Sequence, residues 1–385
     1  MSHNRPNFLR GAETVRDQAE HNEAILFQRI FKLSNAPNRN RLIQQTVEVA
    51  TSENRMYSRS RRSAEIRETI PITKPVGRTV DSKVRYEIDV TRPYRLDLTV
   101  SVLRRLSTNT VDVITPEGEY VRVLDGFRKS VLVRVAQTQP AALTVTIEGC
   151  DGPDECAQVL AAARRILGIE QKLSRFYSAA KGIPWLWPLA VCMRGVKPPR
   201  YPTLWEACVN AIVFQQVSLI AASSISRRLI LALSSPVKCG GIALYAFPGA
   251  EALCVTADGP LRAAGLSANK LATLRRVADA ILSGSLDEKM LEERPSLDAA
   301  MILRGIKGIG PWTATVILLR GLGRLDVFPM NDSSVARNLV FVAGAAHFDI
   351  DAVLTALGPQ RGMLYYHLLL ARLNACGEIG RASFT

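Results

Sequence analysis

A run of glycines and, further along the chain, a lone acid are the residues of this sequence whose types and spacing could do chemistry. The stretch LRGIKGIGPWTA places Gly308 and Gly310 between two segments with helical periodicity, and Pro311 follows directly. Asp332 lies in VFPMNDSSVAR, next to an asparagine and two serines. The glycines predict a tight turn that a ligand can approach closely, and the acid supplies a single carboxylate.

The turn at 308–310 predicts an anion site built from backbone groups. Pro311 is a good residue for the first turn of a helix, and the first N–H groups of a helix have no partner within it. Without a Cβ at Gly308 or Gly310, a phosphate could approach these N–H groups closely. The longer motif hxxhxGhGxxTA, in which h is apolar, extends the phosphate site to Thr313. A tight turn that uses glycine only for packing is the open alternative.

Two kinds of element must position these residues. Short runs of alternating or β-branched residues fill 93–150, among them LDLTVSVL, YVRVL, SVLVRVAQ and ALTVTIEG, and predict a small antiparallel sheet. A helix is predicted at 153–178, and from Tyr201 onward apolar residues recur at three- and four-residue spacings with short breaks. The sequence therefore predicts an α+β fold, in which a small antiparallel-sheet domain precedes an all-α core.

Three domains are predicted: an N-terminal extension at 1–85, a sheet-plus-helix domain at 86–180 and the all-α core at 181–385. The extension is rich in basic and polar residues, with the cluster RSRRS at 59–63, and is predicted to be mostly disordered. It could be a non-specific phosphate-binding arm or have no role. Both interpretations stay open.

The charge balance indicates a polyanionic partner. The chain has 49 Lys and Arg against 35 Asp and Glu, a net charge of +14, and nucleic acid is the commonest polyanion. A basic protein that is merely soluble is the alternative. No apolar run reaches the roughly 18–20 residues that cross a bilayer, and no secretory signal is recognisable at the start. We therefore expect no membrane association and a location in the cytoplasm or nucleoid, or the nucleus in a eukaryote.

The seven cysteines form no CxxC pair, and in such a location they predict buried thiols rather than disulfides. Cys150 and Cys156 could suggest half of a metal site, but no matching half-site is evident in the sequence. Structural zinc is therefore not expected.

The segment IKGIGPWTA followed by DVFPMNDSSVAR resembles the helix-hairpin-helix family of DNA base-excision glycosylases, specifically its inducible 3-methyladenine DNA glycosylase branch. LWEACVNAIVFQQVSLIAA, GLSANKLATLRRVA and GPQRGMLYYHLLLAR also match, and the region that begins PYRLDL is similar to the N-terminal domain of that branch. The resemblance covers about residues 90–375, with its motifs in the same order. It implies damaged double-stranded DNA as the partner and no organic cofactor, and we expect a monomer.

The resemblance implies a catalytic role for Asp332. Cutting a base from its sugar passes through a positively charged, oxocarbenium-like state, which a nearby carboxylate stabilises. The alternative is that Asp332 caps the helix that follows, and both roles can hold together. Family members that also cut the strand carry a lysine where this chain has Trp312, and Lys307 does not match that position. The iron–sulfur branch is disfavoured because only Cys376 follows Asp332.

The resemblance also assigns the residues around a flipped base. Gln216 takes the position of the wedge that fills the gap in the duplex, although it could be only a polar residue at a helix end. Trp312 is a candidate for stacking on the flipped base, with a core tryptophan as the alternative. The remaining base-pocket positions are Val316 and Leu369, together with Val102 and Ser333.

Relatives carry aromatic residues at several of these pocket positions. Their replacement predicts a weaker preference for cationic methylated purines, unless Tyr365, Tyr366 or His367 compensates. The resemblance further implies an alkali ion with a structural role at carbonyl groups near Gly305, Gly308 and Gly310. No catalytic metal is expected.

These features favour a monofunctional DNA N-glycosylase that flips an alkylated or deaminated purine out of the duplex and hydrolyses its N-glycosidic bond in base excision repair. One alternative is a module that recognises distorted DNA without cutting it. Asp332 argues against a pure binder, because such a protein gains nothing from a carboxylate near phosphates. A second alternative is a glycosylase for oxidised purines, against which the missing lysine counts.

Overall fold

The computed structural model describes residues 75–78, 83–127, 129–239, 241–330, 332–344 and 348–379. The predicted extension up to residue 74, with its basic cluster at 59–63, lies outside the described residues. The chain divides into two units, Met1–Pro71 with Trp187–Cys192, and Ile72–Leu186 with Met193–Thr385. Within the first unit, the short helix α6 (Trp187–Cys192) is described. All residues of the candidate site belong to the second unit.

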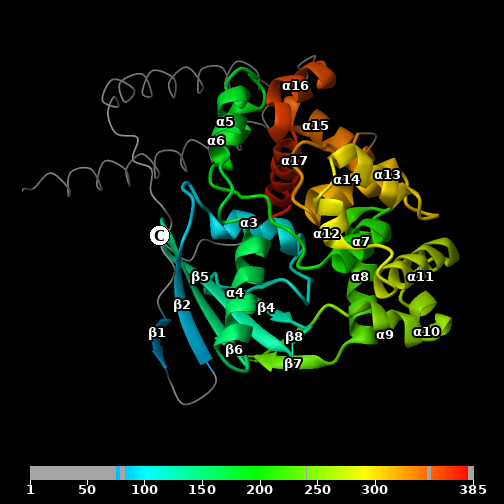
Figure 1. Ribbon diagram of the computed structural model, residues 1–385. Coiled ribbons are helices and arrows are strands. Elements are labelled where there is room, and N and C mark those ends of the chain that lie inside the picture. Colours follow the sequence, from blue (N-terminus) through cyan, green and yellow to red (C-terminus); the bar gives the residue numbers. More distant parts are fainter. Residues whose placement is uncertain are drawn as a thin grey trace, which may run out of the picture. The chain divides into compact units, whose positions relative to one another are not determined.

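A six-stranded antiparallel sheet forms the first part of the second unit (Figure 1). Its strand order is β1-β2-β6-β5-β4-β3, with β1 (Pro75–Arg78), β2 (Lys83–Asp89), β3 (Val113–Ile114), β4 (Tyr120–Leu124), β5 (Val131–Gln139) and β6 (Ala142–Glu148). Alternate residues of β5, such as Val131 and Val133, share a core with α4 (Pro153–Leu167), which lies across the sheet in Figure 1. The predicted sheet is confirmed, and β1 and the start of β2 precede the predicted boundary at residue 86.

The prediction that LDLTVSVL forms a strand is wrong, because this segment is the helix α3 (Leu96–Arg104). The alternation of apolar and polar residues suggested one face exposed to solvent, but every residue from Leu96 to Leu103 is buried. The hydroxyl of Ser101 donates to the carbonyl of Asp97 at 2.6 Å, and that of Thr99 donates to the carbonyl of Arg95 at 2.8 Å. These bonds satisfy the polar side chains inside the helix. The alternation of polar and apolar residues therefore does not distinguish a strand from a buried helix in this segment.

The single helix predicted at 153–178 is two helices, α4 and α5 (Ser174–Ala180). Gly168 ends α4 in a left-handed conformation with φ 58°. A Cβ there would lie 2.7 Å from the carbonyl oxygen of Pro198, so the chain passes too close for any other residue.

The predicted core after residue 181 is helical apart from one hairpin, formed by β7 (Pro236–Cys239) and β8 (Ile242–Tyr245). The prediction that this part is all-α is therefore wrong at 236–245. Leu244 and Cys239 pack against Val121 and Val123, on the sheet face opposite α4, which explains why β4 is buried on both sides.

The helices of this part carry the candidate site. They are α7 (Leu204–Val213), α8 (Leu219–Leu233), α9 (Ala250–Val255), α10 (Asp258–Ala263), α11 (Ala268–Leu282), α12 (Glu288–Glu292), α13 (Ser296–Arg304), α14 (Pro311–Arg320), α15 (Ser333–Ala343), α16 (Ile350–Leu357), η2 (Gly358–Gln360) and α17 (Gly362–Ala375). One apolar core joins residues of α7, α8, α9, α10, α11, α12, α13 and α14. Among the described residues, no helix is long and apolar enough to span a membrane.

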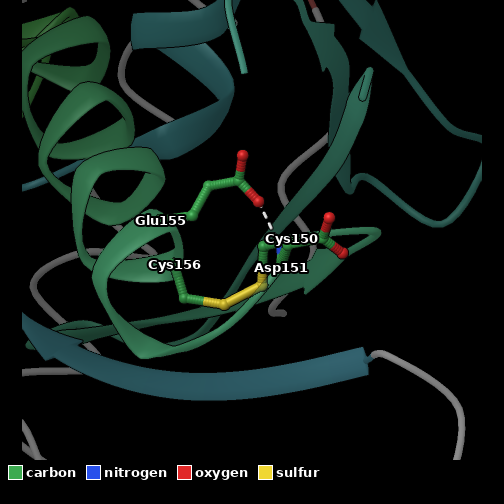
Figure 2. The surroundings of a disulfide bond; sticks show 4 residues. All are labelled: Cys150, Asp151, Glu155 and Cys156. Atoms are coloured by element: carbon green, nitrogen blue, oxygen red, sulfur yellow. Dashed lines mark hydrogen bonds between the residues drawn. A yellow bond between two sulfur atoms is a disulfide. The ribbon is translucent and has the colours of Figure 1, made fainter. Parts of the chain in front are cut away.

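The expectation of free thiols is wrong for one pair, because Cys150 and Cys156 form a disulfide (Figure 2). Cys150 follows β6 and Cys156 lies in the first turns of α4, which brings their Cα atoms to 5.6 Å. Composition and the expected cell compartment predicted free thiols. They carry no information about the turn from β6 into α4, which brings these two cysteines together. Cys208 and Cys239 are buried free thiols, as expected.

A buried ion network joins the sheet to the helices. Arg122 of β4 donates to Asp112 at 2.7 Å and to Glu206 of α7 at 2.5 Å, and all three side chains are buried. Tyr120 also donates to Asp112, at 2.8 Å. Burial raises the pKa of Glu206 to about 7, although Arg122 pulls it down. Both carboxylates therefore depend on Arg122 as their hydrogen-bonded cation.

The stability of the fold is expected to fall in acid because of His367. This side chain is fully buried on α17, and burial lowers its pKa from 6.5 to about 4. An unfolded chain therefore binds more protons than the folded one between these pH values, so the free energy of unfolding falls as pH drops from 6.5 towards 4, by roughly 1.4 kcal/mol per pH unit.

Replacing His367 with phenylalanine should remove this part of the pH dependence. The new ring would keep the packing against Phe176, whose ring centroid lies 4.6 Å from that of His367. Urea unfolding at pH 7 and pH 4.5 measures the effect, and wild type should lose more stability than the variant. An equal loss in both proteins would assign the acid sensitivity to other groups.

Candidate active site

The glycine turn joins two helices as predicted. α13 ends at Arg304 and α14 begins at Pro311, with Gly310 as its N-cap. Ile309 is 4% exposed and anchors the turn in the helical core. Gly308 and Lys307 are exposed at its tip. The first N–H groups of α14 have no partner within the helix, so the backbone here can receive an anion.

The two glycines of the turn have different constraints. Gly308 has φ +105°, and a Cβ there would collide with the side chain of Thr273 on α11. Gly310 has φ −86°, and a Cβ there would meet no atom within 4 Å. Gly308 is therefore required by the fold, whereas the open space at Gly310 is available to a ligand.

This contrast predicts different consequences for alanine at the two positions. Gly308→Ala should destabilise the protein by roughly 1–3 kcal/mol, through its backbone conformation and the contact with Thr273. Gly310→Ala should leave the melting temperature unchanged but weaken duplex binding by roughly tenfold, because its methyl group blocks the approach of a phosphate. Thermal melts and fluorescence anisotropy with a DNA duplex test both expectations. Wild-type affinity in Gly310→Ala would show that no phosphate sits there.

The predicted phosphate residue Thr313 is buried, and its side chain serves the packing of the turn. Its hydroxyl oxygen accepts a hydrogen bond from Nε2 of Gln215 at 2.7 Å. The same Nε2 donates to the carbonyl oxygen of Gly308 at 3.0 Å. A phosphate contact of Thr313 would therefore use its backbone N–H group in the first turn of α14. This role stays a prediction.

Hydrogen bonds of the Gln215 and Lys270 side chains hold the connection between α7 and α8 against the glycine turn and α11. Lys270 donates from Nζ to the carbonyl oxygens of Val213 and Gln215, both at 2.8 Å, and burial lowers its pKa. Sequence motifs do not single out these two side chains, because their partners lie 55 or more residues away. The one signal in the sequence was that both are polar residues within the stretches LWEACVNAIVFQQVSLIAA and GLSANKLATLRRVA.

The predicted wedge residue, Gln216, lies in this connection between α7 and α8. Gln216 is exposed, and its backbone has φ 55°, a left-handed conformation that non-glycine residues rarely adopt. Because the neighbouring Gln215 is held by the glycine turn, the side chain of Gln216 projects from a fixed support. Its role as a wedge stays a prediction that this position supports.

Asp332 meets Trp312 at the start of α15. Oδ2 of Asp332 accepts a hydrogen bond from Nε1 of Trp312 at 2.7 Å. Oδ1 accepts from the N–H groups of Ser334 at 2.7 Å and Val335 at 3.1 Å, so the predicted N-cap is confirmed. The carboxylate is half-buried. Three N–H donors from two helices therefore fix one carboxylate close to an accessible surface.

The loop between α14 and α15 is held by close packing against α17. The N–H group of Gly362 donates to the carbonyl oxygen of Leu325 at 2.7 Å. A Cβ at Gly362 would lie 2.7 Å from Leu319 and 3.0 Å from the carbonyl oxygens of Leu325 and Val327. Glycine at this position thus lets α17 approach the loop that leads to Asp332.

The other predicted pocket residues lie on the same helices. Val316 is buried one turn along α14 from Trp312, and Leu369 is half-buried on α17. Tyr366 and His367 are fully buried and bond to the carbonyl oxygens of Leu319 and Met363, at 3.1 and 2.8 Å.

Tyr365 is half-buried, so of the three residues considered for compensation it is the one with surface to offer a ligand. Val102 on α3 is fully buried, and Ser333 in the first turn of α15 is exposed. The pocket roles of these residues stay predictions.

The predicted alkali ion would have to share its carbonyl groups with the protein. Gly308 accepts from Gln215 at 3.0 Å, and Lys307 accepts from the guanidinium group of Arg276 at 3.1 Å. These donors already close the turn, and the positive charge of Arg276 disfavours a cation beside it. Within the described residues, no group of three or more His, Cys, Asp or Glu side chains could hold a metal ion.

Comparison with known proteins finds sequence similarity to DNA repair enzymes over part of the chain. No protein-family model matches the chain. A DNA-3-methyladenine glycosylase of Bacillus subtilis is 28% identical over 171 residues, 44% of this chain and 56% of that protein. A probable bifunctional transcriptional activator/DNA repair enzyme AlkA of Mycobacterium tuberculosis is 32% identical over 176 residues, 45% of this chain and 34% of that protein. The chain thus spans about half the length of the first relative and a third of the second.

A solved structure has the same fold. The 3-methyladenine DNA glycosylase from Archaeoglobus fulgidus superposes with a TM-score of 0.61 at 23% identity, over 74% of this chain and 97% of that one. The glycine turn, the capped aspartate and the preceding sheet therefore occur here within a known architecture. The chain therefore shares its fold with this glycosylase, and part of its sequence is similar to that of a DNA-3-methyladenine glycosylase.

Proposed function

We propose that the chain is a monofunctional DNA N-glycosylase, which removes an alkylated or deaminated purine from double-stranded DNA in base excision repair. The observation that carries this proposal is the carboxylate of Asp332, which Trp312 and the N-terminus of α15 hold between them. A helix cap needs neither the hydrogen bond from Trp312 nor a position near an anion-binding turn. Both would serve a catalyst of base release, because they fix the carboxylate and bring DNA close to it.

The fixed carboxylate would act on the sugar. As the bond between base and C1′ breaks, positive charge develops on the sugar ring, and the negative charge of Asp332 stabilises it. A water molecule then gives its oxygen to C1′ and its proton to the departing base, which leaves an abasic site. Because three donors hold the carboxylate in place, it does not reorganise as the charge develops.

The surrounding elements would hold the duplex open. N–H groups between Gly308 and Thr313 bind a backbone phosphate, and the exposed Gln216 fills the space that the flipped base leaves. Flipping costs a few kcal/mol, which these contacts offset in part. Trp312 occupies the position of the family's nucleophilic lysine. Without that amine, no covalent adduct forms with the sugar and the strand stays intact.

A second candidate function is recognition of damaged DNA without base release. It is favoured by the fact that both oxygens of Asp332 already accept hydrogen bonds, as those of a purely structural cap would. Each carboxylate oxygen has a further lone pair, so these bonds do not prevent catalysis.

A labelled duplex with one damaged purine tests the proposed reaction type. We expect strand cleavage after treatment with alkali and none without it, together with no protein–DNA adduct after borohydride reduction. Cleavage without alkali, or a trapped adduct, would show lyase activity and overturn the monofunctional assignment. Binding with no alkali-sensitive site would favour the second candidate.

A further inference from the structure

The segment that carries the predicted wedge and the predicted phosphate site are joined by one side chain. Nε2 of Gln215 donates to the carbonyl oxygen of Gly308 at 3.0 Å and to the hydroxyl oxygen of Thr313 at 2.7 Å. Both acceptors belong to the glycine turn and the first turn of α14, whose backbone N–H groups are expected to hold a phosphate. Gln216, the wedge position, is the next residue along the chain. Two segments that lie 93 residues apart in the sequence are therefore in direct contact.

Helix α11 supports both segments. Lys270 donates from Nζ to the carbonyl oxygen of Gln215 at 2.8 Å, and Arg276 donates from Nη1 to a carbonyl oxygen at the tip of the glycine turn at 3.1 Å. Between them, Thr273 packs so closely that a Cβ on Gly308 would collide with its side chain. The three α11 residues are spaced three apart, so they lie side by side along the helix. The connection between α7 and α8 and the glycine turn thus share one support.

These contacts hold the backbone at Gln216 in an uncommon conformation. Its φ is 55°, in the left-handed region, and its side chain is exposed. The carbonyl group that Lys270 binds belongs to the peptide bond between Gln215 and Gln216, so this peptide group cannot rotate freely. Non-glycine residues keep such conformations where surrounding contacts fix them. Gln215 and Lys270 therefore set the direction in which the Gln216 side chain leaves the surface.

A fixed position would help a wedge to enter the duplex. The gap opens beside the flipped nucleotide, and the phosphates of a strand follow one another at regular steps. A wedge held at a set distance from a bound phosphate meets the gap directly, whereas a loosely held one loses conformational freedom on insertion. A misplacement of about 1 Å can lower the rate of an enzyme roughly 100-fold. Contact between the two segments would therefore favour opening of the duplex more than binding to it.

We propose that Gln215 is a positioning residue for base flipping, because its side chain sets the place of the Gln216 wedge relative to the phosphate bound by the glycine turn. This inference rests on the proposed function and adds to it a residue that acts through Gln216 rather than on the base. Phosphate binding and wedge insertion are then coupled, so a duplex held by the turn already faces the wedge.

A duplex with a stable abasic-site analogue tests the inference without base release. This duplex already contains the gap, so wedge insertion is separated from recognition and removal of a base. 2-Aminopurine opposite the gap reports insertion by a change in its fluorescence. Anisotropy gives the affinity for this duplex and for an undamaged one of the same sequence. In wild type we expect the fluorescence change together with tighter binding of the abasic duplex.

Gln215→Leu should lower this preference for the abasic duplex roughly tenfold and remove most of the fluorescence change. Leucine is similar in size but cannot donate to the turn. The affinity for the undamaged duplex should stay within about twofold, because the N–H groups of the turn remain. Gly308 is exposed, so water can replace the lost donor at its carbonyl oxygen, and the melting temperature should change little.

Arg228→Met is the matched control. Arg228 also joins distant segments, because its Nε donates to the carbonyl oxygen of Ala264 at 2.8 Å, but it lies in the second half of α8. Loss of its charge should weaken binding of both duplexes alike and leave the preference for the abasic one unchanged. An equal loss of preference in Arg228→Met and Gln215→Leu would overturn the inference.

Combination with Gln216→Ala distinguishes positioning from a structural role. If Gln215 acts through Gln216, Gln215→Leu should lower the preference by no more than about twofold once Gln216 is alanine. Equal losses with and without the Gln216 side chain would show that Gln215 only stabilises the fold. That result, or an unchanged preference in Gln215→Leu alone, would overturn the inference.

The abasic duplex and base release keep the two proposals apart. Wedge insertion that Gln215→Leu abolishes, without release of any damaged purine by wild type, would support the inference and overturn the proposed glycosylase. Base release at equal rates by wild type and Gln215→Leu would support the glycosylase and overturn the inference. Equal affinity of wild type for the abasic and undamaged duplexes would also overturn the inference.

Discussion

Asp332→Asn is expected to slow base release by roughly 10²–10³-fold while duplex binding stays close to that of wild type. The amide keeps the shape of the side chain and one oxygen acceptor, but it has no negative charge to stabilise the cationic sugar. It also cannot serve all three donors as the carboxylate does, so a small loss of stability is expected. Single-turnover base release and anisotropy binding measure the two effects separately.

Asp332→Ser is the matched control for the helix cap. Serine is a favoured N-cap residue, so the start of α15 should be retained at a cost of about 1 kcal/mol or less. If Asp332 were only a cap, this variant would keep its activity. We expect it to be as inactive as Asp332→Asn, and substantial activity in Asp332→Ser would contradict the catalytic role.

Arg122→Met is expected to produce the largest loss of stability, about 3–5 kcal/mol. The substitution leaves Asp112 and Glu206 buried without their hydrogen-bonded cation, next to the junction of sheet and helices. The loss should be smaller at pH 5 than at pH 8, because protonation of Glu206 relieves the uncompensated charge. Urea unfolding at both pH values measures it.

Lys83→Met provides the comparison at the surface. Lys83 pairs with Glu148 at 2.9 Å, and the exposed fraction of the lysine side chain is 52%. An exposed pair contributes about 1 kcal/mol or less, so this variant should unfold close to wild type. Equal losses in Lys83→Met and Arg122→Met would show that burial does not set the strength of the Arg122 network.

The predictions that the structure confirms depend on residues close together in the sequence. A glycine turn followed by Pro311 marks a helix start, and an aspartate before two serines caps a helix. The signals and their structural outcomes lie within a few residues of each other, so sequence alone carries them.

The predictions that failed depend on distant partners. α3 alternates like a strand because helices and sheet bury it on all sides, and the β7–β8 hairpin becomes a strand pair where it covers β4. The disulfide between Cys150 and Cys156 requires the turn from β6 into α4. Local patterns cannot distinguish these cases, because tertiary burial decides them.

The candidate site also contains residues that local sequence identifies and residues whose contacts depend on distant partners. Asp332, Trp312 and Gln216 could be selected from motifs, and the structure brings the first two into hydrogen-bond contact. Gln215 and Lys270 act through partners far along the chain, on Thr313 and Val213. Motif spacing alone gave no sign of their contacts.

Detection of the released base tests directly whether the protein excises damaged bases and whether Asp332 is required. Wild type and Asp332→Asn would each be incubated with genomic DNA that carries alkylated and deaminated purines, and free bases would be identified by mass spectrometry. We predict free damaged base from wild type and at least about a hundredfold less from Asp332→Asn at equal DNA binding. DNA binding by wild type without any free base would contradict the proposed glycosylase activity and indicate a recognition protein in which Asp332 has only a structural role.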